Sequence, residues 1–336
     1  IEFGTSGVLD AAGILHEVTT FRRDVRTDGR HAEVEFGASL DEDLARRDFT
    51  VNAVAYSPTR GEVRDPYGGI RDLEARVIRA VGDPTARMRE DRLRALRGIR
   101  FAARFDFAMD GATWDAICAS AAHLTRLSAE RVKQELEKTM DQVSAPSVAF
   151  QRWQESGALA VLIPELSELS QEALRSLDCA AQPGLPRRPG RRLIRLAALF
   201  SDLPPERALR ECLRLRFSKN DAQWISALVG RFRALDRPIT AALAEAASAD
   251  AGVVRRWIAE VGRTHLPAFF RLAAARWSAR RDLADGSAPA ARAVQRLYRR
   301  SLGVAMTDSV ELRDLAVVGN GLRGCGIAPG PRLGMI

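Results

Sequence analysis

Lysine, clustered cysteine and long apolar runs are all scarce in this chain of 336 residues. None of the four cysteines forms a Cys-x-x-Cys pair, so we expect neither structural zinc nor a disulfide framework, but a reducing, cytoplasmic setting. No apolar stretch approaches the roughly 20 residues that a membrane helix needs, so we expect no membrane partner. The chain opens on Ile1 rather than on methionine, as expected of a segment from a longer reading frame.

Arginine supplies nearly all of the positive charge. The formal net charge is +8, although lysine occurs only at Lys133, Lys138 and Lys219. A surplus of guanidinium groups favours a phosphate-rich partner, because each neutralised phosphate releases counterions. A GC-rich coding bias accounts for the ratio of arginine to lysine, but it does not account for the net surplus.

The first part of the chain carries strand and turn signals. Polar and β-branched residues alternate over 17–21, as in a half-buried strand. The run 51–56 predicts a second strand or a short helix, because periodicity cannot assign so short an apolar run. Gly61 marks a hairpin turn, and 77–81 is another strand-like run. These signals predict a small β-containing head.

Beyond about residue 88 the apolar residues recur at steps of three and four, which is typical of amphipathic helices. Ser128, with an acid in the turn that follows, is a candidate N-cap. The expected helices cover 114–125, 129–142, 146–156, 190–200, 205–216, 219–234, 251–262 and 286–301. The sequence thus predicts an α+β fold, in which an elongated all-α neck, body and tail follow the small β-containing head.

Two charged motifs are the most informative features. Arg46-Arg47-Asp48 ends a loop, and the segment 90–97 reads Glu-Asp-Arg-Leu-Arg-Ala-Leu-Arg further along the chain. On a helix, residues spaced three apart form a stripe that winds slowly round one side. Such a stripe comprises Asp91, Arg94, Arg97 and Arg100. A solvated charged face with intrahelical ion pairs is its plain structural explanation.

A carboxylate and a guanidinium on one helix can also distinguish nucleotide bases. The carboxylate accepts a hydrogen bond from the exocyclic amine of cytosine or adenine, while the guanidinium donates to the neighbouring ring nitrogen or, in cytosine, to O2. Uracil and guanine present a carbonyl in place of the amine, so the carboxylate would face another acceptor at a cost of about 1–3 kcal/mol. One Asp–Arg pair can therefore accept C and A and reject U and G.

With the segment 65–69, Asp-Pro-Tyr-Gly-Gly, between them, these motifs resemble the class II tRNA nucleotidyltransferase and bacterial poly(A) polymerase family. The resemblance covers nearly all of the chain and is most specific over 43–105. It implies that Asp91 and Arg94 read the incoming base.

The same resemblance implies roles for the other residues of these two motifs. Nucleotide-binding roles fall on Arg47, Arg97 and Arg100. Ribose-side or structural roles in the nucleotide site fall on Asp48 and Asn52.

Two further segments match the family. The resemblance makes Asp65, Gly68 and Gly69 a coupler between head and neck, whose glycine pair would absorb hinge movement. An ordinary Gly-rich turn is the alternative. Glu130 and Arg131 are the polar pair of a segment like the family's fifth motif, for which we expect a structural role in supporting the base-reading helix.

Catalysis is expected to need two Mg²⁺ ions about 3.5–4 Å apart, held by clustered carboxylates. The family supplies an Asp-x-Asp pair upstream of a Phe-Gly-Thr segment, and in this chain 3–5 is already Phe-Gly-Thr. The resemblance then leaves Glu17, the third carboxylate, as the candidate catalytic and metal-binding residue, with an ordinary edge-strand glutamate as the alternative. By itself the chain is therefore not expected to catalyse.

The sequence accordingly predicts a nucleotidyltransferase head over 1–75, a neck that binds base and RNA over 76–145, and a tRNA-binding helical body and tail over 146–336. The implied function is addition of C and A, from CTP and ATP, to the 3′ end of tRNA. A poly(A) polymerase, or an enzyme that adds only A or only C, is the alternative within the family. A non-catalytic RNA- or nucleotide-binding protein and a helical scaffold are alternatives of other classes. The oligomeric state is left open.

Overall fold

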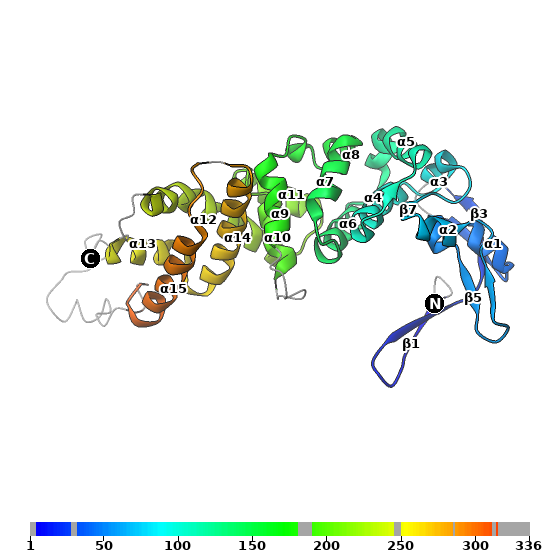
Figure 1. The fold of residues 1–336 in the computed structure, drawn as a ribbon, viewed down its shortest axis with the longest axis horizontal. Coiled ribbons are helices and arrows are strands. Elements are labelled where there is room, and N and C mark those ends of the chain that lie inside the picture. The colour runs from blue at the N-terminus through cyan, green and yellow to red at the C-terminus, as the bar shows by residue number, and fades with distance from the viewer. Residues whose placement is uncertain are drawn as a thin grey trace, which may run out of the picture.

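The protein is elongated, with the β-containing head at one end and the helices in a row behind it (Figure 1). A computed structural model of the chain describes residues 5–27, 32–180, 190–244, 250–284, 286–310 and 314. In these residues a short β-rich part is followed by a long helical one, which confirms the predicted α+β organisation.

The described strands form four two-stranded sheets, of which the first three are antiparallel and the last is parallel. They are β1 (Thr5–Leu9) with β2 (Leu15–Thr19), β3 (Arg22–Thr27) with β4 (Ala32–Phe36), β5 (Ala55–Ser57) with β6 (Glu62–Arg64), and β7 (Val77–Ile78) with β8 (Ala108–Met109). The strand expected over 17–21 is β2, which begins and ends two residues earlier. The run 51–56 divides into a 3₁₀ turn, η1 (Thr50–Asn52), and β5.

Helices of the head and neck begin where a short polar side chain can cap them. Ser39 and Glu42 form a capping box at α1, and Asp83, Asp110 and Ser128 cap α3, α5 and α6, as predicted for Ser128. These elements are α1 (Leu40–Ala45), α2 (Gly69–Glu74), α3 (Pro84–Glu90), α4 (Leu93–Phe105), α5 (Gly111–Ser120), η2 (Ala121–Arg126) and α6 (Ala129–Gln142).

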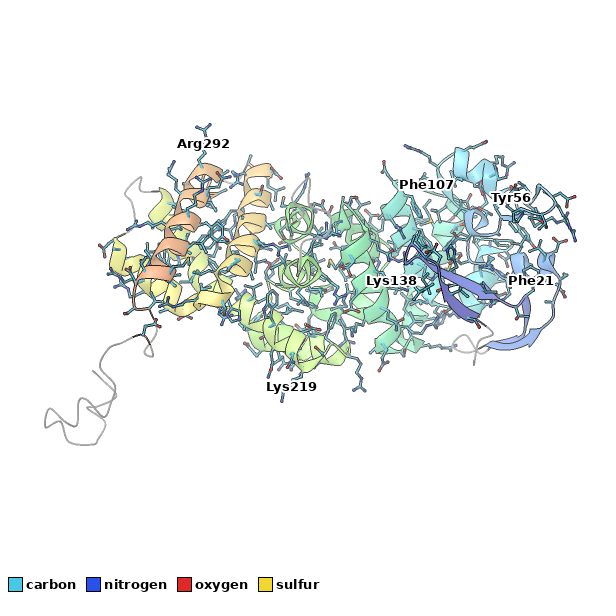
Figure 2. All side chains as sticks on the ribbon, turned by 90° about the horizontal axis from the view of Figure 1, so that it is seen from below. Phe21, Tyr56, Phe107, Lys138, Lys219 and Arg292 are labelled. Carbon is cyan, nitrogen blue, oxygen red and sulfur yellow. The ribbon has the colours of Figure 1, made fainter. Side chains whose placement is uncertain are left out.

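The body is helical throughout its described length. Its elements are α7 (Pro146–Glu155), α8 (Ala158–Leu162), η3 (Pro164–Leu166), α9 (Gln171–Cys179), α10 (Arg191–Leu199), α11 (Pro205–Arg214), α12 (Lys219–Ala244), α13 (Ala251–Val261), η4 (Arg263–His265), α14 (Leu266–Asp282) and α15 (Ala291–Thr307). Lys219 and Arg292 project outward from its surface (Figure 2).

Several expectations for the helices were wrong, and α8 and α9 were not predicted. The helix expected over 286–301 starts at Ala291 and runs to Thr307. α12 was expected to end at 234, but it continues through Pro238, where the Thr240 hydroxyl donates to the carbonyl of Asp236. α14 was missed because its buried residues lie all round it, so no one-sided apolar stripe marks it.

One hydrophobic core runs from Phe49 in the head through the neck into the body, where it ends at Ala305. α4 lies inside it, with Leu96 and Ile99 fully buried. A small second core of Leu44, Ala53 and Val81 lies under the loop that follows α1, which we call the head loop. The loop after α1 is thereby fixed against the neck. Of the helices that the structure describes, none is long and apolar enough to cross a membrane.

Candidate functional site

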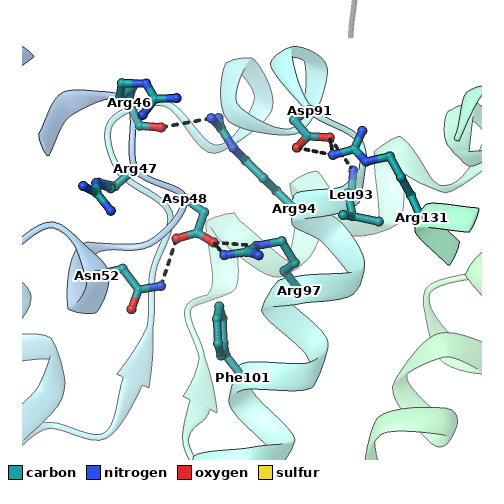
Figure 3. A pocket seen from close by; sticks show the side chains of 10 residues that line it. All are labelled: Arg46, Arg47, Asp48, Asn52, Asp91, Leu93, Arg94, Arg97, Phe101 and Arg131. Atoms are coloured by element: carbon teal, nitrogen blue, oxygen red, sulfur yellow. Dashed lines mark hydrogen bonds and ion pairs between the residues drawn. The ribbon is translucent and has the colours of Figure 1, made fainter. Parts of the chain in front are cut away.

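A cavity of about 590 Å³ lies where the loop after α1 meets the start of α4 and of α6 (Figure 3). This volume is in the range of about 300–1,000 Å³ that is usual for small-molecule sites. Its lining residues are Arg46, Arg47, Asp48, Asn52, Asp91, Leu93, Arg94, Arg97, Phe101 and Arg131. Five guanidinium groups against two carboxylates make the cavity favourable for an anion.

A buried carboxylate holds the two arginines at the head side of the cavity. Asp43, at the end of α1, accepts hydrogen bonds from Nε and Nη2 of Arg47 at 3.2 and 2.6 Å, and it lies 3.6 Å from Nη1 of Arg46. The Arg47 side chain is still 45% exposed, so its guanidinium can reach a ligand without leaving the loop. Arg46 was not predicted to line the site, although it belongs to the same motif.

Asp48 joins the head loop to α4. Its Oδ1 accepts from the backbone N–H of Phe49 and from the amide of Asn52, both at 2.9 Å, while its Oδ2 lies 2.6 Å from Nη2 of Arg97 (Figure 3). With 8% of its surface exposed, Asp48 is nearly enclosed by these partners. Of the two roles expected for Asp48 and Asn52, these contacts favour the structural one.

Asp91 does not lie on the helix of Arg94, contrary to expectation. It ends α3 with an extended backbone, and its Oδ1 accepts from the N–H of Leu93 at 3.0 Å, which caps α4. The break arises because a short carboxylate satisfies the first free N–H groups of a new helix. Arg92, which lies between Asp91 and Leu93 in the chain, does not line the cavity. Its pKa is lowered by burial and then by repulsion from Arg126 and Arg89.

Arg94 links the neck to the backbone of the head loop. Its Nη1 donates to Glu90 Oε2 at 2.7 Å and to the carbonyl of Arg87 at 3.2 Å, and its Nη2 donates to the carbonyl of Arg46 at 3.0 Å (Figure 3). Held at three points, this guanidinium is presented to the cavity in a fixed orientation.

Arg97 and Phe101 form the next turn of α4. The Arg97 guanidinium lies over the Phe101 ring, 5.3 Å from its centroid, while Nε and Nη2 face Asp48. Phe101 in turn meets Phe49 edge to face at 5.9 Å. Phe101 was not predicted as a site residue, although a residue four positions after Arg97 shares its helix face.

Arg100 is brought to a different place from the other arginines of α4. Its side chain is 4% exposed, and Nε donates to Glu135 of α6 at 2.7 Å. Its guanidinium lies over the ring of the lining residue Phe101, 4.4 Å from the centroid, but Arg100 itself does not line the cavity. Nη1 also approaches Gln142 at 3.3 Å. These contacts make Arg100 a buried tie between α4 and α6, and the nucleotide-binding role expected for it stays a prediction.

Glu130 and Arg131, the polar pair at the start of α6, contact different parts of the molecule. Glu130 is exposed and lies 3.6 Å from Arg216 of the body. Arg131 instead reaches Asp91, with Nη2 at 2.9 and 2.8 Å from the two carboxylate oxygens, and it lines the cavity (Figure 3). Arg131 thus joins the residues of the candidate site.

The predicted coupler is a tightly packed turn in this structure. Asp65 accepts from the N–H of Gly69 at 2.7 Å and of Ile70 at 3.0 Å, and so caps α2. Gly68 has φ +70°, and a Cβ on Gly69 would lie 2.1 Å from the carbonyl oxygen of Thr50. Both glycines are therefore required by local geometry, and the hinge role stays a prediction.

Glu17 lies on β2, opposite Gly7, on a hairpin that projects from the head (Figure 1). It is not among the residues that line the cavity. Across the described parts of the chain, no three His, Cys, Asp or Glu side chains gather as a metal site. The catalytic and metal-binding role of Glu17 stays a prediction.

Comparison with known proteins agrees with this architecture. Residues 1–79 match the family described as poly A polymerase head domain, and residues 106–169 match the one described as a probable RNA and SrmB-binding site of polymerase A. The CCA-adding enzyme of Limosilactobacillus reuteri is 45% identical over 145 residues, and that of Streptococcus thermophilus is 47% identical over 142. Each match covers 42% of this chain and 35% of the relative, about a third of its length.

Solved structures extend the likeness to the whole chain. The Bacillus stearothermophilus CCA-adding enzyme in complex with CTP is 28% identical, with a TM-score of 0.71 over 99% of this chain and 74% of that one. The Thermotoga maritima CCA-adding enzyme complexed with tRNA, at 21% identity and a TM-score of 0.66, shares the fold. A polymerase head on a helical neck, with an arginine-lined cavity at their junction, is the architecture of a class II nucleotidyltransferase. In sequence over its head and neck, and in fold along its length, the chain is similar to the CCA-adding enzymes and bacterial poly(A) polymerases.

Proposed function

We propose that this protein acts in the addition of C and A, from CTP and ATP, to the 3′ end of tRNA. The observation that carries the proposal is the presence of both Asp91 and Arg94 in the lining of a cationic cavity of nucleotide size. Relatives that match the chain are CCA-adding enzymes, and one of them has been solved with CTP.

The base would be read where the two helices of the neck meet. A carboxylate accepts from the exocyclic amine that cytosine and adenine share, and a fixed guanidinium donates to the ring acceptor beside it. Asp91 and Arg94 supply these two groups. Selectivity depends on their rigidity, which the bonds of Arg94 to Glu90 and to the head-loop backbone provide.

The triphosphate would lie toward the head loop. Arg47 presents an accessible guanidinium there, and Arg97 lies between the loop and the base-reading wall. Guanidinium groups bind phosphate through two parallel N–H donors, and they stay charged at every accessible pH. We therefore assign phosphate contacts to Arg47 and sugar or phosphate contacts to Arg97, with Asp48 and Asn52 holding the loop.

Divalent metal chemistry is typical of this family, and we infer Mg²⁺ as the ion with Glu17 as one ligand. The described residues do not by themselves build such a site, because no three His, Cys, Asp or Glu side chains gather among them. No step of the transfer is therefore assigned to a metal held by these residues.

The RNA partner would lie along the helices. Residues 106–169 match an RNA-binding family, and the chain carries a net charge of +8. Arginine-rich helices suit contacts to the RNA backbone and to its shape rather than to its sequence. We infer a cytoplasmic setting from the free thiols of Cys118, Cys179 and Cys212, with no membrane partner.

Titration of the chain with each of the four nucleoside triphosphates tests the proposal. We expect CTP and ATP to bind at least about tenfold more tightly than UTP and GTP, because an unmatched polar contact costs about 1–3 kcal/mol. Equal affinity for all four would contradict it. Extension of a tRNA that lacks CCA by the intact protein then separates the alternatives: unbounded tailing with ATP alone indicates a poly(A) polymerase.

A further inference from the structure

Arg131 reaches the base-reading wall from a different helix, forty positions along the chain from Asp91. A single nitrogen, Nη2, donates to both oxygens of the Asp91 carboxylate, at 2.9 and 2.8 Å. Nη1 of the same guanidinium is buried and makes no hydrogen bond to any residue that the structure describes. The guanidinium is therefore held in place by Asp91 rather than by a wider network on α6.

The lone pairs of Asp91 are nearly all occupied by protein donors. A carboxylate offers about four acceptor positions. Oδ1 uses two of them, for the Leu93 N–H at 3.0 Å and for Arg131, whereas Oδ2 uses one, for Arg131. One acceptor position on Oδ2 is thus left for a ligand. A base amine that pairs with Asp91 would be directed to that oxygen.

Without Arg131, one hydrogen bond from Leu93 would hold the carboxylate, and its plane could turn about the Cβ–Cγ bond. A turning carboxylate can withdraw from a base carbonyl, so it no longer rejects uracil or guanine as firmly. Bridging both oxygens removes this freedom. We infer that Arg131 is a specificity-determining residue, which positions Asp91 so that a single carboxylate oxygen reads the amine of C or A. The inference rests on the proposed function.

The alternative is that Arg131 only supports the junction of α4 and α6, as a residue of the fifth motif was expected to do. The two roles differ in what they change. A support lowers stability and the affinity for every nucleotide alike, whereas a positioning residue changes the ratio of affinities between CTP and UTP.

The experiment measures affinities of Arg131→Ala for CTP, ATP, UTP and GTP by isothermal titration calorimetry. Lys138→Ala is the matched control, because it removes one positive charge from the same helix, at a side chain 44% exposed and outside the cavity lining. We expect the ratio of the UTP to the CTP dissociation constant to fall by about tenfold in Arg131→Ala. Lys138→Ala should keep the ratio of the unmodified chain.

A double-mutant cycle separates action through Asp91 from direct contact with the base. If Arg131 works through Asp91, the double variant Asp91→Ala/Arg131→Ala should have the same ratio of the UTP to the CTP dissociation constant as Asp91→Ala alone. The inference is overturned if the changes in this ratio caused by the two single variants multiply in the double variant. It is also overturned if Arg131→Ala keeps the ratio of the unmodified chain. If the unmodified chain itself shows no preference, the proposed function fails instead, so the two failures are distinguishable.

Discussion

Replacing Arg100 tests whether it is a buried tie or a nucleotide ligand. In Arg100→Leu, Glu135 would keep its burial but lose the guanidinium at 2.7 Å, while Lys138 remains 3.3 Å from its other oxygen. Removing one partner of a buried ion pair typically costs about 3–5 kcal/mol of stability. Because Lys138 remains, we expect a loss at the lower end, about 3 kcal/mol.

Urea unfolding followed by circular dichroism measures this loss. The control is Arg104→Leu, since the exposed Arg104 sits one turn further along α4 and donates to Gln142; we expect a loss of at most about 1 kcal/mol there. The double variant Arg100→Leu/Glu135→Leu should regain most of the stability, because no unpaired charge is then buried. An unchanged unfolding free energy for Arg100→Leu, together with lost CTP binding, would refute the reasoning and restore the nucleotide-binding role.

Three further predictions concern single side chains. Gly69→Ala should lower the melting temperature by several degrees, because its Cβ would lie 2.1 Å from a backbone carbonyl, whereas Gly111→Ala, with open space around it, should not. Burial raises the pKa of the Cys212 thiol to about 12, so this cysteine should resist alkylation at pH 8 until the protein is unfolded, as mass mapping can establish. Burial also raises the pKa of Asp178 above its ordinary value of 3.8. The protonated carboxyl therefore contributes its stability below pH 3.8, and this contribution is lost as the pH rises through the raised pKa. The stability of the unmodified chain relative to Asp178→Asn should therefore fall between pH 4 and pH 7, and a rise would contradict this.

Much of the helical part could be predicted because apolar periodicity and caps are local signals. α6 begins after Ser128 and covers 129–142 as expected. The head was harder to predict, since its strands are two to six residues long and only their pairing defines them. α14 shows the limit of the method, because a helix buried on all sides carries no amphipathic pattern.

The candidate site was predictable in composition and only partly in geometry. Steps of three residues turn a helix by about 300°, so Arg97 and Arg100 differ by about 60° in direction. Which of them faces a cavity depends on where α6 packs, and the sequence does not contain that information locally. The same reason hid the contact between Arg131 and Asp91. The break at Asp91 was missed because a single capping residue does not interrupt the apolar period on either side of it.

Replacing Asp91 by asparagine tests the central claim, base selection by a carboxylate, most directly. An amide nearly matches the carboxylate in shape but can donate to the carbonyl of uracil or guanine. We predict that the preference for CTP over UTP, measured by calorimetry on the unmodified chain and on Asp91→Asn, shrinks by about tenfold in the variant. A preference that is the same in both proteins would contradict the account.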